Sequence, residues 1–161
     1  MHILVTGGTG YIGSHAVVEL VQEGHTVLVV DNLVNSSEEC LRRVAQIVGQ
    51  PIPFVKADLR DREQVERLFQ QQPKFDCCMH FAGLKAVGES VAEPLRYYEN
   101  NLVSTMVLAD VMGKYGCKNI IFSSSATVYG TPDHSPITED FPKGEIANPY
   151  GQTKSMIEQI L

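Results

Sequence analysis

The chain has 161 residues, 43% of them hydrophobic, which suits one domain that buries roughly 70% of the surface of its unfolded form. Its formal net charge of −6 comes without a basic stripe, so we expect no nucleic acid and no anionic membrane as a partner. No apolar run approaches the roughly 18 residues of a membrane span, and no cationic start with an apolar stretch indicates a signal peptide. A cytoplasmic location is therefore expected.

Short apolar runs alternate with amphipathic segments, and this alternation predicts a parallel sheet with helices on both faces. Strands are expected near 2–6, 26–31, 53–57, 75–81 and 118–123. Helices are expected near 11–23, 37–48, 62–71, 94–115 and 149–161. The predicted fold class is α/β, a Rossmann-type doubly wound sheet.

Turn-forming residues mark the ends of these segments. Gly24 is expected directly after the first helix, Ser36 or Ser37 at the amino-terminal cap of the second, and Pro94 in the first turn of the fourth. Residues 131–149 contain four prolines and form an irregular stretch longer than compact domains usually hold. This stretch predicts a functional loop over a cleft, and the alternative is a solvated excursion.

The cysteines, Cys40, Cys77, Cys78 and Cys117, show no C-x-x-C pattern, so buried reduced thiols are expected. Cys78 and His80 share one face of a predicted strand, the only arrangement that favours a metal. Their spacing matches no familiar site and no further ligands cluster nearby, so we expect no metal.

The first strand passes into the first helix through a glycine-rich turn, TGGTGYIG at residues 6–13. Gly7 permits the tight turn, Gly10 lets a pyrophosphate approach the backbone, and Gly13 lets the helix pack close to the sheet. The helix N-terminus then offers N–H groups to the pyrophosphate. This spacing after a strand predicts a dinucleotide site.

The residues that follow the second and third strands favour NAD. Asp31 can accept both ribose hydroxyls of an adenosine, and its charge would repel the 2′-phosphate of NADP. The alternative is a turn-initiating aspartate before Asn32. Asp58 and Leu59, after the third strand, are expected to flank the adenine.

The fourth and fifth strands end in small and polar residues at the sheet edge where open α/β folds bind ligands. Phe81-Ala82-Gly83 allows the backbone to lie along a cofactor, and Lys85 can hold the nicotinamide ribose or a phosphate, unless it is an ordinary solvated lysine. The hydroxyls of Ser123–Ser125 can donate to a substrate oxygen, unless they only form a turn.

Tyr150 and Lys154 lie one helical turn apart and face the same way. A phenol has a pKa of about 10, so a tyrosine base that works near neutrality needs a nearby cation to favour its phenolate. The pair predicts a general base prepared by an ammonium. The alternative, a tyrosine and a lysine without a role, loses weight because of the upstream turn and serines.

The chain ends within the last predicted helix, since residues 155–161 stay apolar-periodic without a capping glycine or proline. Two complete halves of a dinucleotide fold need a sixth strand. We therefore expect residues 1–161 to form an incomplete NAD-binding domain, truncated before that strand. The alternative is a closed five-stranded sheet with a terminal helix.

Five phrases of the sequence resemble the extended branch of the short-chain dehydrogenase/reductase family, which acts on nucleotide sugars. They are Val5–His15, Asp31–Leu33, His80–Ser90, Ser123–Gly130 and Asn148–Gly151. The resemblance implies that Ser125 and Tyr150 reach the sugar. It also implies contacts to NAD from Tyr11, Ile12, Asp31, Asn32, Leu33, Val34, Asn35, Ser36, Asp58, Leu59, Phe81, Ala82, Gly83, Leu84, Lys85, Asn100, Tyr150 and Lys154.

The activity that this resemblance implies is the NAD-dependent interconversion of UDP-glucose and UDP-galactose at C4. Tyr150 would take the 4-hydroxyl proton while hydride passes from C4 to NAD, and hydride would return to the opposite face of the 4-keto sugar. The likeness covers the amino-terminal half of the family's usual length. It lacks the carboxyl-terminal lobe that grips the uridine diphosphate, and full-length members are expected to be homodimers.

Two other functions remain open. A nucleotide-sugar 4,6-dehydratase shares the cofactor, the tyrosine and the lysine, but it needs an acidic pair where Ala126 and Thr127 follow Ser125 here. An NAD-binding module without activity of its own is the other.

Overall fold

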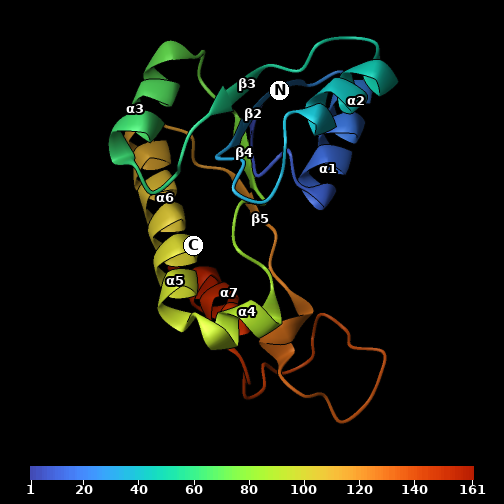
Figure 1. Cartoon of the computed structure of the whole chain (residues 1–161), viewed down its shortest axis with the longest axis vertical. Coiled ribbons are helices and arrows are strands. Elements are labelled where there is room, and N and C mark those ends of the chain that lie inside the picture. The colour runs from blue at the N-terminus through green and yellow to red at the C-terminus, as the bar shows by residue number, and fades with distance from the viewer.

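Five parallel strands form the predicted sheet, in the order β3-β2-β1-β4-β5 (Figure 1). The computed structural model describes residues 1–161. The strands are β1 (His2–Thr6), β2 (Thr26–Asp31), β3 (Phe54–Lys56), β4 (Cys77–His80) and β5 (Ile120–Phe122). The order reverses between β1 and β4, the switch point at which open α/β sheets bind ligands. The doubly wound fold is confirmed.

In Figure 1, α1 and α2 lie on one side of the sheet and α3 and α6 on the other, while α4, α5 and α7 pack together below it. They are α1 (Tyr11–Gln22), α2 (Glu39–Val48), α3 (Arg62–Gln71), α4 (Val87–Ala92), α5 (Pro94–Tyr98), the π-helical turn η1 (Glu99–Val103), α6 (Ser104–Lys114), the 3₁₀ helix η2 (Ala126–Tyr129) and α7 (Pro149–Ile160). Most predicted strands and helices agree with these bounds to within about two residues at each end.

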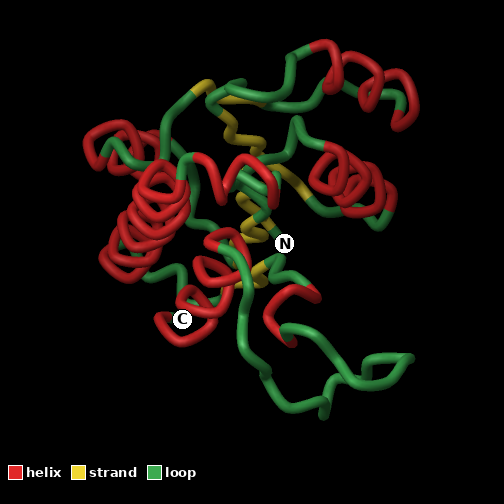
Figure 2. The backbone as a smooth tube through the Cα atoms, turned by 60° about the horizontal axis from the view of Figure 1, so that its bottom comes forward, coloured by secondary structure: helices red, strands yellow, loops and turns green.

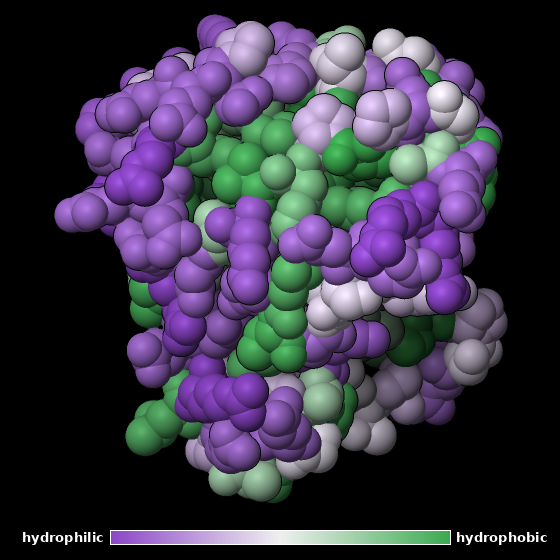
Figure 3. Space-filling model, turned by 45° about the horizontal axis from the view of Figure 1, so that its top comes forward, coloured by the Kyte–Doolittle hydropathy of each residue, from purple (hydrophilic) through white to green (hydrophobic).

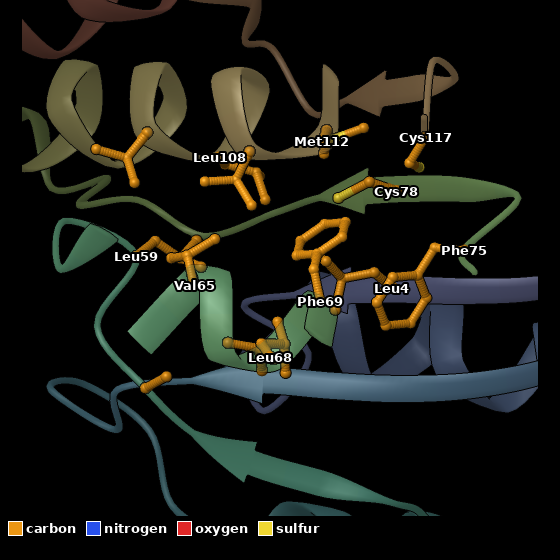
Figure 4. Close-up of a cluster of buried hydrophobic side chains, with 14 of the residues drawn as sticks. Leu4, Leu59, Val65, Leu68, Phe69, Phe75, Cys78, Leu108, Met112 and Cys117 are labelled. Carbon is orange, nitrogen blue, oxygen red and sulfur yellow. The ribbon is translucent and has the colours of Figure 1, made fainter. Parts of the chain in front are cut away.

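Alternate residues of the central strands point to opposite faces of the sheet. Leu4 and Leu28 belong to a buried cluster with side chains of α3 and α6 (Figure 4). Val5 and Val29 belong to a second cluster with side chains of α1 and α2. Burial on both faces explains why β1 and β2 are continuous apolar runs in the sequence.

The single helix predicted over 94–115 is wrong in detail. It consists of α5, η1 and α6, so a π-helical turn interrupts the α-helical ladder. The pattern also missed α4, whose six residues are too few to show a period, and the short η2.

The capping predictions have mixed outcomes. Gly24 follows α1 with a φ of 80°, and Pro94 lies in the first turn of α5, as expected. The cap of α2 is wrong, because Glu38 precedes that helix without a side-chain cap. Ser36 instead donates its hydroxyl to Asp31, at 3.3 Å.

The prolines of the 131–149 stretch lie mainly in a loop, Gly130–Asn148, that projects from the molecule between η2 and α7 (Figures 1 and 2). None of its residues lines the main cleft, so the prediction of a loop over the cleft is wrong. The two ends of this loop nevertheless pack closely against each other. A Cβ on Gly130 would lie 2.4 Å from the Glu145 carbonyl oxygen, and one on Gly144 would lie 2.6 Å from that of Tyr129.

The four cysteines are free thiols. Cys77, Cys78 and Cys117 are buried as expected, and burial raises the pKa of the Cys78 thiol well above its usual value. Cys40 is only half-buried, because α2 covers the sheet with its other face.

No helix of this chain is both long and apolar enough to cross a membrane. Hydrophilic side chains cover most of the face seen in Figure 3, and an apolar hollow opens between them.

Candidate active site

A cleft runs along the carboxyl ends of the strands, and its empty space, including the part open to solvent, is about 1030 Å³. Most of the predicted cofactor residues line it. They are Gly7, Gly10, Tyr11, Ile12, Gly13, Asp31, Asn32, Val34, Asn35, Asp58, Leu59, Phe81, Ala82, Gly83, Leu84, Lys85, Asn100, Tyr150 and Lys154.

Three predicted residues lie outside the lining. Leu33 and Ser36 support the turn after β2 instead. Ser125, the last residue of the turn Ser123–Ser125 after β5 (the serine turn), caps η2. The structure adds Val30, Ala57 and Ser104, which the sequence did not single out, and it places Ser123 and Ser124, two of the three serines after β5, in the lining.

Different glycines of the glycine-rich turn allow close internal packing and leave space for a ligand. A Cβ on Gly7, whose φ is +69°, would lie 2.5 Å from the Ala82 nitrogen, and one on Gly13 would lie 2.3 Å from the Gly7 oxygen. Gly13 therefore lets α1 pack on the turn itself. A Cβ on Gly10 would meet only the Gly7 oxygen, at 3.3 Å, so Gly10 leaves space toward the cleft.

The sequence alone does not explain why a glycine occupies position 8, Gly8. A Cβ there would lie 2.7 Å from a methyl group of Val29 on β2. The turn therefore passes so close to the neighbouring strand that a side chain at this position would collide with it.

Asp31 is held at the end of β2 by three neighbours. Its Oδ1 accepts hydrogen bonds from the Leu33 nitrogen at 2.9 Å and from the Ser36 hydroxyl at 3.3 Å, and its Oδ2 accepts from the Thr9 nitrogen at 3.3 Å. Leu33 has a φ of 62°, a backbone conformation that is rare for leucine. The turn-initiating role and a ribose-binding role of Asp31 are thus compatible.

Asp58 faces the cleft in a bidentate pair with Arg60. The guanidinium donates from Nη2 to Oδ2 at 2.8 Å and from Nε to Oδ1 at 3.1 Å. Hydrogen bonding from Arg60 lowers the pKa of the Asp58 carboxyl below its usual value. The carboxylate is therefore ionised near neutrality and available to accept a hydrogen bond.

The structure brings Tyr150 and Lys154 to the cleft beside the serine turn. Lys154 donates from Nζ to the Ser123 carbonyl oxygen at 2.7 Å, and Nζ lies 6.0 Å from the Tyr150 ring centroid. The lysine is 5% exposed, and burial lowers its pKa to about 8. Near neutrality, a mostly charged ammonium therefore lies within electrostatic range of the phenol.

Ser125 is close in sequence but has another local partner. Its Oγ accepts hydrogen bonds from the Thr127 nitrogen at 3.3 Å and from the Thr127 hydroxyl at 2.9 Å, which caps η2. The residues of this turn that line the cleft are Ser123 and Ser124.

Asn101 is a site residue that sequence reasoning missed. Its side chain accepts from the Leu84 nitrogen at 2.8 Å and donates to the Leu84 oxygen at 3.0 Å and to the Thr153 hydroxyl at 3.1 Å. It therefore ties the turn after β4 to α7. A buried amide within an apolar helix was the only signal, and Asn100 next to it is the one that lines the cleft.

His80 is fully buried, and hydroxyls contact both of its ring nitrogens, Thr6 at 2.6 Å and Thr105 at 3.0 Å. The Thr105 hydroxyl donates its proton to the backbone carbonyl oxygen of Asn101. It therefore accepts a hydrogen bond from Nε2 of His80, and the Thr6 hydroxyl donates to Nδ1. Burial, aided by the charge of Lys154, lowers the pKa of His80 to about 3. The ring is thus neutral and fully hydrogen-bonded, and Cys78 beside it belongs to the apolar core.

This arrangement, a glycine turn, an acidic residue after β2 and a Tyr/Lys pair around one cleft, defines a dinucleotide-binding α/β domain. The family described as the NAD dependent epimerase/dehydratase family matches residues 3–161, and the chain belongs to it.

Individual relatives are more specific. The chain is 61% identical to a UDP-glucose 4-epimerase of Bacillus subtilis (strain 168), over 100% of this chain and 47% of the relative. It is 57% identical to one of Neisseria meningitidis serogroup B, over 99% of this chain and 47% of that relative. The chain therefore spans about half the length of the curated relatives it matches.

Solved structures agree. A crystal structure of UDP-glucose 4-epimerase from Bifidobacterium longum in complex with NAD⁺ and UDP superimposes with a TM-score of 0.96 at 54% identity. The match covers 99% of this chain and 48% of that one.

Proposed function

We propose that this chain supplies the NAD-binding and proton-transfer half of a UDP-glucose 4-epimerase, which interconverts UDP-glucose and UDP-galactose. The observation that carries the proposal is the placement of Tyr150 and a buried Lys154 in the same cleft as the glycine turn and Asp31. Relatives that are 61% and 57% identical carry that enzyme's name.

The residues present fit NAD. Gly10 leaves open space beside the N-terminus of α1, where a pyrophosphate gains from backbone N–H groups. Asp31 would accept hydrogen bonds from the adenosine ribose, and Asp58 and Leu59 would flank the adenine; the lining of the cleft by all three supports these roles. Phe81–Lys85 and Asn100 would lie along the nicotinamide half, and Lys154 would reach its ribose. Bound NAD would reversibly accept a hydride from C4 of the sugar.

Tyr150 is the proposed base. Its phenolate takes the proton of the 4-hydroxyl as hydride leaves C4, and it returns that proton when hydride comes back to the other face. Lys154 favours the phenolate through its charge, and the Ser123 carbonyl holds the ammonium in place. Ser125 is the proposed hydroxyl donor to the sugar, and from its capping position it would have to turn toward the cleft.

The remaining assignments concern the whole protein. We propose that residues 1–161 are an NAD-binding domain and that the uridine diphosphate is gripped by a carboxyl-terminal lobe outside this sequence. A homodimer is proposed for the complete enzyme by analogy with the family. Four free thiols favour a cytoplasmic location. The dehydratase alternative stays weak, because Ala126 and Thr127 stand where its acidic pair is needed.

The test is a comparison of Tyr150→Phe with the unchanged chain. Both are assayed for UDP-galactose turnover as the 161 residues alone and joined to the remaining carboxyl-terminal residues of the Bacillus subtilis relative. We expect kcat to fall roughly 10²- to 10⁴-fold in the active form while NAD affinity stays unchanged, because the ring and its packing remain.

Two results would contradict the proposal. Near-normal kcat in Tyr150→Phe would place the base elsewhere. NAD binding without turnover in either form would leave the binding module as the correct function.

A further inference from the structure

We propose that Glu158 is a positioning residue that clamps the serine turn and the base of the Gly130–Asn148 loop onto α7. The inference rests on the proposed function, because it assigns to Glu158 the alignment of the serine turn with Tyr150.

Glu158 lies on the same face of α7 as the proposed catalytic pair. It follows Tyr150 by two helical turns and Lys154 by one. Its Oε1 accepts a hydrogen bond from the Ser124 hydroxyl, and its Oε2 accepts from the Lys143 ammonium in the loop. One half-buried carboxylate thus joins three segments that are distant in sequence.

Two side chains of α7 hold the serine turn in opposite senses. Lys154 donates to the carbonyl oxygen of Ser123, whereas Glu158 accepts from the hydroxyl of Ser124. Because these contacts come from successive turns of the helix, they fix the position of the serine turn along α7. Ser125, the next residue, caps η2, and Thr127 of η2 lies against Gly151 in the first turn of α7.

The loop base extends the same clamp to the start of α7. Gly130 packs against the backbone of Glu145, and a Cβ on Gly151 would lie 2.7 Å from a methyl group of Ile146 and 3.0 Å from the Thr127 hydroxyl. The chain that leaves η2 therefore returns in contact with it, directly before Tyr150. Lys143 in the same loop donates a hydrogen bond to Glu158.

The charges suit a fixed clamp. Burial alone would raise the pKa of Glu158, but hydrogen bonds from Lys143 and Ser124 hold it below its usual value. The carboxylate stays ionised near neutrality and keeps both acceptors. Apart from Lys143, the nearest charged neighbour along its helix face is Lys154, which is engaged by Ser123.

Two readouts separate positioning from general stability. The first is the rate at which added UDP-sugar reduces bound NAD, followed by the absorbance of reduced nicotinamide in whichever form turns over. The second is hydrogen exchange of the Thr127 and Val128 amides, which bond to Ser125. The exchange measurement uses the 161-residue chain and does not depend on activity.

For Glu158→Ala we expect a roughly tenfold slower hydride step with NAD affinity within about twofold of wild type, since slight misplacement costs rate rather than cofactor binding. Exchange of the two amides should speed up about tenfold. Glu158→Gln keeps an acceptor for Ser124 and should restore most of both. Ser124→Ala combined with Glu158→Ala should be no slower than Glu158→Ala alone, because Glu158→Ala already removes the contact between Ser124 and Glu158.

The matched control is Glu66→Ala. Glu66 is 26% exposed and pairs with Lys114 at 2.9 Å between α3 and α6, whereas Glu158 is 24% exposed. Glu66→Ala should change neither readout. Unchanged hydride transfer and unchanged exchange in Glu158→Ala, or equal effects of Glu66→Ala, would overturn the inference. If wild type binds NAD without reducing it, the proposed function fails, and the exchange result alone then decides the role of Glu158.

Discussion

The two ends of the cleft are built in different ways. At the glycine-turn end, Gly7, Gly10 and Gly13 shape the backbone within one short segment, and Asp31 is fixed mainly by its own turn. At the serine-turn end, contacts join β5, η2 and α7 through side chains, as in the bond from Lys154 to Ser123. The residues that define the first end mostly lie in one short segment of the sequence, whereas those of the second end are brought together only when the chain folds.

This difference predicts two kinds of sensitivity. A change at the glycine-turn end acts on cofactor affinity or on the turn itself. A change at the serine-turn end acts on rates and on pH dependence, because buried charges and long-range hydrogen bonds are concentrated there.

The largest effect is expected from Gly10→Val. The Cβ at this position meets only one backbone atom, so the fold should persist, but the branched side chain would fill the approach of the pyrophosphate. We expect NAD affinity to fall by at least roughly 100-fold with an unchanged circular dichroism spectrum.

Gly13→Val is the informative partner. Its Cβ would lie 2.3 Å from the Gly7 oxygen, so this variant should lose stability as well as binding. Tight NAD binding by a folded Gly10→Val protein would refute the assignment of the turn.

Lys154→Met addresses the serine-turn end. Burial lowers the lysine pKa to about 8 in the folded state from 10.5, so the folded protein carries a full penalty below pH 8 that disappears as pH rises toward 10.5. Across that window the free energy of unfolding of wild type should rise by about 3 kcal/mol relative to Lys154→Met. Urea unfolding at several pH values measures this difference.

Lys114→Met is the control, because the hydrogen bond that Lys114 donates to Glu66 raises the pKa of Lys114 above its usual value of 10.5. The stability that this pair adds is lost only as pH rises above 10.5. The stability difference of Lys114→Met from wild type should stay flat over the same window. A flat difference for Lys154→Met as well would mean that the buried lysine is not perturbed.

Asp31→Arg should have the smallest effect of the three. It removes the acceptor for the ribose hydroxyls and offers a cation to a 2′-phosphate, so NAD binding should weaken about tenfold while NADP binding improves. Titration of both cofactors tests this. The loss of bonds to Leu33 and Thr9 perturbs the turn too, and Asp31→Asn serves as the control for that. Unchanged NAD affinity in Asp31→Arg would reduce Asp31 to a turn residue.

The sequence predicted the glycine-turn end well because its determinants are local. A turn glycine such as Gly7 is needed for its φ, and apolar runs such as Ile3–Val5 mark a buried strand by themselves. The same is true of Pro94, which begins a helix where the sequence indicates.

The rest depends on tertiary contacts. Asn101 and Glu158 are ordinary polar residues in helical segments, and only folding brings them to Leu84 and Ser124. Ser36 looked like a helix cap, but Asp31 and Thr9 compete for its hydroxyl. The 131–149 stretch has the composition of a loop, and composition does not fix the direction in which a loop projects.

The π-helical turn Glu99–Val103 divides a long helical segment into two parts that contact different neighbours. One residue inserted into an α-helix rotates the faces of the helix beyond the insertion by about 100°. The residues before the insertion, in α5, contact α7, whereas those after it, in α6, pack on α3. A single inserted residue thus lets one continuous helical segment pack on the hydrophobic core at one end and on α7 at the other.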